Sequence, residues 1–321
     1  MYNFNYLIEK INKANFIFEP FKHIYIENFL SQEHFDKIIN SSEIKSIKAK
    51  NDKELIDELL NSGYLPIEFP GCTTDLKKYI SWHKHQKETS DHHSACSGFG
   101  VALRLYDFVS EILKELNKFL NSKKFNEALA EKIGADIKTL VVDGGIQKYL
   151  DKYEISPHPD TRKKAAAYMV NINHSENSET LNYHTSYLKF KKKYKYVEEF
   201  WKGNQDINRA WVPWEWTDVI KKQVKNNSIV IFYPSDDTMH AVKCDYDHLK
   251  TQRTQLYGNL WHDNNQALYK LEWEQLDLLR KNIVNKKTKT LRQHFVSILP
   301  LPIKQKIKNF LLNTEIGKRK L

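Results

Sequence analysis

The segment from Thr139 to Trp261 is the feature that most restricts how this chain can fold. It contains six short runs rich in β-branched and aromatic residues, with turn-forming residues between them. Several such runs in succession are typical of an all-β sandwich or barrel. The predicted strands are Thr139–Val142, Gly145–Leu150, Ala165–Ile172, Tyr183–Phe190, Ser228–Tyr233 and Gln255–Trp261.

The residues before this β region predict a support made mainly of helices. His23–Ile26 has strand composition, and a helix is expected to follow Ser31, which stands where an N-cap residue would. Residues 63–100 are rich in Gly, Pro, His and Ser and are expected to be mostly loop. Apolar residues at helical spacing predict one amphipathic helix over Val101–Phe119 and a second over Phe125–Ile133.

We therefore expect an α+β chain whose core is mainly β. Three parts are predicted along it: an N-terminal strand and helical support region at 1–138, a β core at 139–265 with an insert at about 191–222, and a C-terminal helical basic extension at 266–321.

The positive charge of the chain belongs to its C-terminal end. The whole sequence has 50 Lys and Arg against 40 Asp and Glu. Residues 280–321 hold 12 of these basic residues and one acid, so the remainder carries 38 basic and 39 acidic side chains. A nearly neutral body gives no indication of a surface that follows a nucleic-acid backbone.

No apolar run approaches the roughly 20 residues that a membrane-spanning helix needs. The first residues also lack the continuous apolar stretch of a signal peptide, so a cytoplasmic location is expected. Residues 290–321 mix apolar residues with lysines. They predict either a basic amphipathic helix in peripheral contact with an anionic membrane or a helix docked on the body.

The cysteine and histidine content does not predict a zinc site. Three cysteines, Cys72, Cys96 and Cys244, form no CxxC pair and no disulfide framework. A group of histidines lies in the predicted loop: His83, His85, His92 and His93. Their spacing matches no zinc pattern, and we interpret them as loop residues or as part of a segment that caps a site.

Two histidines and one aspartate are placed to share a metal ion. His158 and Asp160 are two positions apart after a predicted strand, so their side chains can point the same way. His240 follows the predicted strand Ser228–Tyr233 and a turn. Two imidazoles and one carboxylate on one face form the facial triad of non-haem Fe(II) oxygenases, which leaves positions open for a bidentate acid and dioxygen.

Arg253 supplies a group that such a site would need. It lies thirteen residues after His240, at the start of the last predicted strand. A buried guanidinium binds a carboxylate through two parallel hydrogen bonds, as the far carboxylate of 2-oxoglutarate would require.

At these residues the chain resembles the Fe(II)/2-oxoglutarate-dependent oxygenase superfamily, in particular its prolyl-4-hydroxylase-like branch. The matching features are His158-x-Asp160, His240 after Phe232-Tyr233-Pro234, and then Arg253; the segment from Pro20 to Leu30 is also similar to the entry strand and helix of that branch. The resemblance implies a double-stranded β-helix (jelly roll) supported by N-terminal helices. It also implies Fe(II) as cofactor, with 2-oxoglutarate and dioxygen as co-substrates.

The resemblance implies three further co-substrate residues. Tyr149, nine residues before His158, corresponds to a tyrosine that often contacts the co-substrate, and Asn171 is expected to line the same pocket. Thr254 is the hydroxyl next to Arg253, whereas the family commonly has Ser or Ala one position later, where this chain has Gln255.

The implied reaction is oxidative decarboxylation of 2-oxoglutarate coupled to hydroxylation of an unactivated C–H bond. The expected substrate is a small molecule, a saccharide-linked compound, or an amino-acid or peptidyl side chain. Because Asp160 is an acid, the site resembles that of a hydroxylase and not that of a halogenase. Two alternatives remain: desaturation or epimerisation on the same scaffold, and a catalytically silent jelly-roll binding protein.

Two segments have an open interpretation. The run Leu181–Tyr187 predicts either substrate contacts or an edge strand with outward polar residues. The tryptophans of Trp211–Trp216 predict either a lid or ordinary packing.

Overall fold

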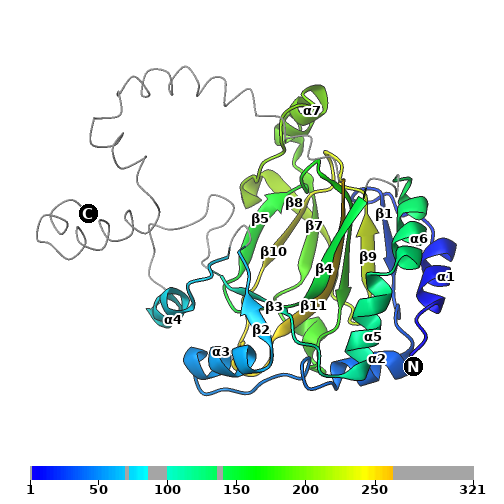
Figure 1. Cartoon of the computed structure of the whole chain (residues 1–321). Helices are drawn as coiled ribbons and strands as arrows, with labels where there is room; N and C mark the ends of the chain where they lie inside the picture. The colour runs from blue at the N-terminus through cyan, green and yellow to red at the C-terminus, as the bar shows by residue number, and fades with distance from the viewer. Residues whose placement is uncertain (1, 69–71, 86–99, 136–139, 263–321) are drawn as a thin grey trace, which may run out of the picture. The chain divides into compact units, whose positions relative to one another are not determined.

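A seven-stranded antiparallel sheet forms the centre of the structure. The computed structural model describes residues 2–68, 72–85, 100–135 and 140–262, all within the compact unit Met1–Tyr269. The sheet has the order β1-β9-β6-β11-β4-β3-β2 (Figure 1). Its strands are β1 (His23–Ile26), β2 (Tyr64–Pro66), β3 (Ala102–Leu105), β4 (Leu140–Tyr149), β6 (Lys164–Asn171), β9 (Ile229–Phe232) and β11 (Arg253–His262).

A second antiparallel sheet has four strands in the order β5-β10-β7-β8. Its strands are β5 (Glu154–His158), β7 (Thr185–Phe190), β8 (Thr217–Lys222) and β10 (His240–Lys243). Side chains from both sheets meet in shared clusters: Tyr149 of β4 packs with Ile155 of β5, and Val230 of β9 packs with Tyr187 of β7. The α+β prediction with a mainly β core is confirmed at this level.

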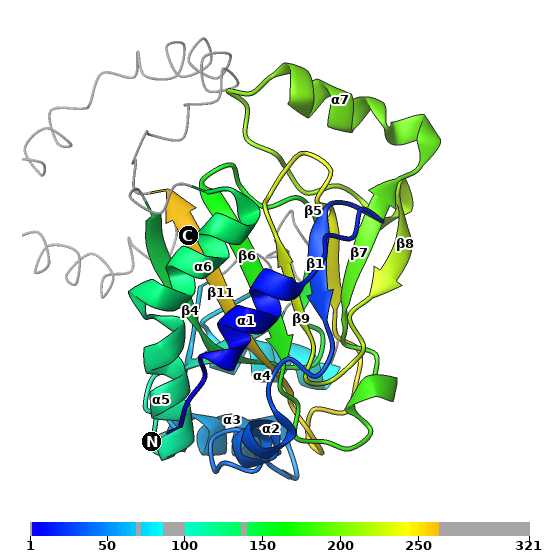
Figure 2. The same cartoon turned by 90° about the vertical axis from the view of Figure 1, so that its right-hand side faces the viewer.

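Helices cover the other face of the large sheet. Figure 2 shows α1 (Tyr6–Lys13), α5 (Glu111–Leu120) and α6 (Lys123–Ile133) over β4, β11 and β6. The remaining helices are α2 (Gln32–Ile39), α3 (Asp52–Asn61), α4 (Leu76–His85) and α7 (Tyr196–Gly203). Within the described residues, no helix is long and apolar enough to cross a bilayer.

The two-residue period of a strand separates the faces of the large sheet. In β6, Tyr168 and Val170 pack into the helix-side core, while Ala167 and Met169 face the smaller sheet. Gly258 of β11 makes room for the Tyr168 ring, since a Cβ at that position would lie 2.3 Å from its Cζ.

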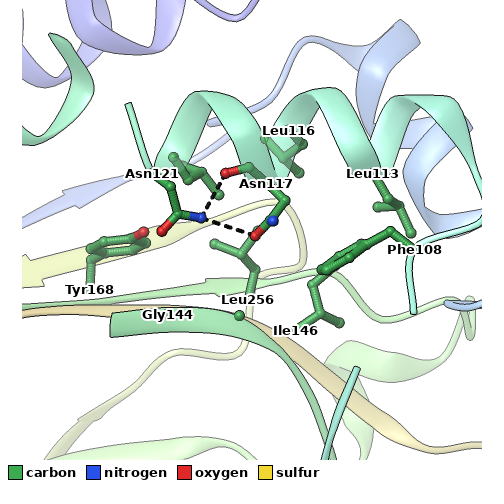
Figure 3. Close-up of a pocket in the computed structure, with 11 residues that line it drawn as sticks. Phe108, Leu113, Leu116, Asn117, Asn121, Gly144, Ile146, Tyr168 and Leu256 are labelled. Atoms are coloured by element: carbon green, nitrogen blue, oxygen red, sulfur yellow. Dashed lines mark hydrogen bonds between the residues drawn. The ribbon is translucent and has the colours of Figure 1, made fainter. Parts of the chain in front are cut away.

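Helix α5 closes tightly on this face. Figure 3 shows Leu113 and Leu116 above Ile146, Gly144 and Leu256, with Asn117 and Asn121 hydrogen-bonded along the helix. The cavity between them measures about 10 Å³, which is barely room for one water molecule. This face is therefore packing surface, and the ligand sites lie on the other side of the sheet.

The predicted helix over Val101–Phe119 is wrong in its first part. Ala102–Leu105 forms β3 between β2 and β4, and the helix begins only at Glu111. Glu43, which is distant in sequence, holds the start of this helix. Its carboxylate accepts hydrogen bonds from the backbone N–H groups of Val109 and Ser110, both at 2.7 Å. The helical spacing of apolar residues continued by chance across this boundary.

Other differences concern short elements. Residues 63–100, expected to be mostly loop, contain β2 and α4, and the two strands predicted on either side of Gly144 are one strand, β4. The insert at about 191–222 contains α7 and β8. Residues 136–139 and the predicted extension at 266–321, with its membrane contact, lie outside the described residues.

Candidate metal centre and its cavities

The smaller sheet brings the two predicted histidine ligands together. His158 ends β5 and His240 begins β10, and the two residues are register partners in that antiparallel pair. Their side chains therefore leave the same face of the sheet, with ring centroids 4.4 Å apart. His158 and His240 are 82 residues apart in sequence, and the pairing of β5 with β10 brings them together as a candidate metal site.

Hydrogen bonds fix the protonation of both rings in the form that binds a metal. Nδ1 of His158 lies 2.8 Å from the Ser156 carbonyl oxygen, and Nδ1 of His240 lies 2.9 Å from that of Thr238. A carbonyl oxygen can only accept, so each Nδ1 carries the proton and each Nε2 presents a lone pair.

Burial keeps the two imidazoles neutral. It lowers the pKa of His158 to about 3, with a further contribution from neighbouring His240, and it also lowers the pKa of His240. Metal binding to these rings therefore needs no proton release near neutral pH.

Asp160 completes the triad. One ligand atom from each of His158, Asp160 and His240 lies within 4.8 Å of the others, and all three residues are buried. Burial alone would raise the pKa of Asp160, but the charge of Lys164 and its hydrogen bond hold that pKa well below its usual value. Two neutral imidazoles and one carboxylate fit an Fe(II) ion, with the donor set of the facial triad.

Lys164 is a site residue that the sequence analysis missed. Its Nζ lies 2.7 Å from Oδ1 of Asp160, and both side chains are nearly buried. Lys164 opens β6, while Asp160 follows β5, so the pair ties the metal ligand to the large sheet. A Lys four residues after an Asp is common, and nothing in the spacing alone distinguishes it.

A small cavity of about 70 Å³ lies between the sheets, with the triad at one end and Arg253 in its lining. Arg253 is 2% exposed; its Nη2 donates to Oγ1 of Thr185 at 2.9 Å and to Oε1 of Gln255 at 3.3 Å. Its Nη1 is buried and has no hydrogen-bond partner among the described residues. A buried guanidinium with a donor left over indicates an anionic ligand.

Tyr149 lies beside Arg253 in this cavity. The two residues are register partners in β4 and β11, and the guanidinium carbon is 4.6 Å from the centre of the Tyr149 ring. In the orientation that satisfies both ends of the Gln147 amide, its nitrogen donates to the Tyr149 hydroxyl at 2.5 Å and its oxygen accepts from Arg104. That orientation leaves the Tyr149 O–H able to donate to a ligand.

Thr254 and Asn171 are not among the residues that line the small cavity. Thr254 follows Arg253 on a strand and therefore points to the opposite face, where its hydroxyl donates to the Gln252 carbonyl oxygen. The Asn171 amide donates to two backbone carbonyl oxygens and accepts from Gln255 at 3.2 Å. Asn171 therefore does not line the pocket as expected. Its side chain supports Gln255, which in turn contacts Arg253.

A larger cavity of about 790 Å³ adjoins His158 and Asp160. Its lining shares His158, Asp160 and Lys164 with the small cavity. One wall comes from the large sheet and includes Tyr257 and Trp261, and another comes from residues 208–211. The predicted metal ligands His158 and Asp160 thus line both a small polar chamber and a chamber large enough for a substrate.

The two open segments have clear positions. Strand β7 is an inner strand of its sheet, so the interpretation of Leu181–Tyr187 as an edge is wrong, and Thr185 within it holds Arg253. In the tryptophan segment Trp211 lines the large cavity, whereas Trp216 stacks on Tyr194 in the packing around α7.

A second group of histidines and aspartates lies away from the triad. His83 of α4 has Nδ1 at 2.9 Å from Asp52 and Nε2 at 3.1 Å from Asp151. The two carboxylates outweigh the effect of burial and raise the pKa of His83 to about 9, so the ring is an imidazolium. His248 accepts from the Asp151 backbone N–H at Nδ1, so its Nε2 carries the proton given to Asp52.

This second group is therefore a hydrogen-bonded clasp and not a metal site. A ring whose Nδ1 accepts from a backbone N–H has no lone pair to give a metal at Nε2. Of the other residues in the predicted histidine-rich loop, His85 is exposed on α4, and His92, His93 and Cys96 lie outside the described residues.

Comparisons with known proteins give no match in sequence and only weak structural similarity. No protein-family model matches the chain, and a search of curated proteins gives no match either.

Among solved structures, the chain is similar to a prolyl-4-hydroxylase from Pseudomonas putida, at 7% identity and a TM-score of 0.41 over 81% of this chain and 99% of that one. It is similar to a prolyl hydroxylase from Trichoplax adhaerens in complex with a hypoxia inducible factor peptide fragment, at 10% identity and a TM-score of 0.41 over 83% and 91%. It is also similar to a 2OG-Fe(II) oxygenase family protein from Burkholderia pseudomallei, at 9% identity and a TM-score of 0.29 over 71% and 99%.

Proposed function

We propose that this protein is an Fe(II)- and 2-oxoglutarate-dependent oxygenase whose two sheets form a double-stranded β-helix. The observation that carries the proposal is the joint placement of a buried triad, His158, Asp160 and His240, and a buried Arg253 with an unpartnered donor in one small chamber. The resident iron would supply dioxygen activation, and 2-oxoglutarate would supply two electrons through its decarboxylation.

Each group of this chain then has a defined task. His158 and His240 hold the metal through Nε2, with both rings oriented by backbone carbonyl oxygens. Arg253 pairs with the far carboxylate of 2-oxoglutarate, and the Tyr149 hydroxyl donates to the same co-substrate. Arg253 and the triad are themselves buried, and burial strengthens electrostatic interactions with a bound co-substrate.

The large cavity is the proposed binding site of the substrate. Its lining includes His158 and Asp160 but not Arg253, so a substrate bound there would present a C–H bond to the metal while 2-oxoglutarate occupies the small chamber. We propose hydroxylation of that bond as the outcome. The substrate is a small molecule, a saccharide-linked compound or a peptidyl side chain.

The proposal is tested by searching for the product of the reaction. The full chain, loaded with Fe(II), is incubated with 2-oxoglutarate, ¹⁸O₂ and a metabolite extract, and product masses are compared with those from the Asp160→Ala variant. The expected result is a compound that gains one ¹⁸O atom only with the wild-type chain. A substrate that loses two hydrogens or changes configuration without gaining oxygen would indicate desaturation or epimerisation instead.

A further inference from the structure

Arg209 belongs to the wall of the large cavity, and its guanidinium is buried behind the surface of that wall and forms one long ion pair. Its side chain is 1% exposed, and Nη1 lies 3.4 Å from Oδ1 of Asp236. Its Nε and Nη2 are buried and have no hydrogen-bond partner within the described residues. Leaving buried donors of a charged group unsatisfied is costly, so their presence in a folded protein points to a ligand.

The carboxylate of Asp236, with which Arg209 forms its ion pair, is shared with a second arginine. Arg162 Nη2 lies 2.8 Å from the same Oδ1 of Asp236 and is the closer partner. The other donors of Arg162 are engaged, Nε with the Ile207 carbonyl oxygen and Nη1 with Gln205. Two guanidinium groups therefore share the Asp236 carboxylate, and Arg209 is the more distant of the two partners.

The geometry of the unpartnered atoms selects the kind of ligand. In a guanidinium, the Nε–H bond and one Nη2–H bond run parallel along one edge, and this edge binds both oxygens of a carboxylate or phosphate. Asp236 contacts Arg209 through Nη1, so that edge remains available. Asn208 and Trp211, close to Arg209 in the chain, line the same cavity as His158.

We propose that Arg209 binds an anionic group, a carboxylate or a phosphate, on the substrate that is oxidised at the metal centre. The inference rests on the proposed function and names the class of substrate for that site. Arg209 lines the large cavity and not the chamber of Arg253, so the two arginines bind two different anions. Trp211 and Trp261 give the cavity aromatic surface on which the rest of such a substrate can pack.

Equilibrium binding of two simple anions tests this without turnover. Phenylphosphonate and benzoate are titrated by calorimetry into the full chain, with and without saturating 2-oxoglutarate and Mn(II). We expect saturable binding of at least one probe under both conditions, and the preferred probe tells phosphate from carboxylate. Arg209→Gln should weaken that binding at least 10-fold, since hydrogen bonds to a charged group contribute about 1.5–3 kcal/mol.

Matched variants distinguish binding through the Nε–Nη2 edge of Arg209 from a general attraction of the anion to positive charge. Lys163→Gln removes one charge from the same cavity lining and should weaken binding less than about 3-fold. Arg209→Lys keeps the charge but loses the fork, so it should not restore the affinity. Asp236→Asn removes the competing carboxylate and should strengthen binding, which a purely structural role of Arg209 would not produce.

Three results would overturn the inference: no saturable binding to the wild-type chain, equal losses in Lys163→Gln and Arg209→Gln, or a probe that depends on Arg253 and not on Arg209. If Arg209→Gln does not fold, unchanged probe binding in Asp236→Asn would overturn the inference instead. Because the probes bind without catalysis, intact probe binding in a chain that forms no succinate would reject the oxygenase and keep the anion site. A chain that forms succinate but binds neither probe would support the oxygenase and reject Arg209 as an anion site.

Discussion

Replacing Arg253 by glutamine should remove most of the affinity for 2-oxoglutarate while leaving the metal site in place. Arg253 is 2% exposed, and none of the described carboxylates forms an ion pair with it. Its contacts are a threonine hydroxyl and a glutamine amide, both neutral, and Nη1 has no partner in the described part of the chain. The guanidinium is thus held in position, and its charge is left for a ligand.

The size of the effect follows from this arrangement. Truncating one partner of a buried, hydrogen-bonded charge pair costs about 2–5 kcal/mol in binding. A value of about 3 kcal/mol corresponds to roughly 100-fold weaker binding of 2-oxoglutarate. Arg253 is not one of the three metal ligands, so Mn(II) affinity should change by less than about 3-fold.

The assay is calorimetric titration of 2-oxoglutarate into the Mn(II)-loaded chain, with a separate Mn(II) titration of each variant. Thr185→Val is the matched control, because it removes only the hydroxyl that accepts from Nη2 at 2.9 Å. That loss should cost about 1 kcal/mol, or roughly 5-fold in affinity. Unchanged 2-oxoglutarate binding in Arg253→Gln, or an equal loss of Mn(II) binding, would refute the role assigned to Arg253.

Three further predictions concern stability. The hydrogen bonds of His83 to Asp52 and Asp151 should stabilise the fold by on the order of 3 kcal/mol below pH 6.5. Because folding raises the pKa of His83 to about 9, this contribution should be lost as the pH rises through about 9. The free energy of unfolding in urea should therefore fall less steeply at alkaline pH in His83→Gln than in the wild-type chain. Glu43→Gln should cost about 2 kcal/mol by weakening the cap of α5, measured by urea unfolding at pH 7. Gly258→Ala should cost about 1–3 kcal/mol in the same assay, since the new Cβ meets the Tyr168 ring; an unchanged midpoint would contradict the packing described for that pair.

Much of the fold could be predicted where strands are apolar. The apolar residues of Ala165–Ile172 and Ser228–Tyr233 located β6 and β9 to within a residue. Strands β5 and β10 were missed because their sequences, EISPH and HAVK, carry the polar residues of the site. A strand that ends in a metal ligand lacks the apolar alternation from which strands are predicted.

The site was predictable in its ligands and less so in its surroundings. His158, Asp160 and His240 meet as the HxD spacing and the later histidine indicated. Thr254 was assigned to the cavity from its place next to Arg253, and the alternation of β11 turns it away. Thr185 and Arg209 come from segments distant in sequence, so only the paired strands and the cavity lining reveal that they belong to the site.

The most direct test of the account is the uncoupled conversion of 2-oxoglutarate to succinate. The Fe(II)-loaded wild-type chain should form succinate in the presence of dioxygen without added substrate, and His158→Ala, Asp160→Ala and His240→Ala should each form none above background. Succinate formation at the wild-type rate in the three variants would contradict the claim that these side chains hold the catalytic metal, and no succinate from the wild-type chain with bound Fe(II) would contradict the assignment of 2-oxoglutarate as co-substrate.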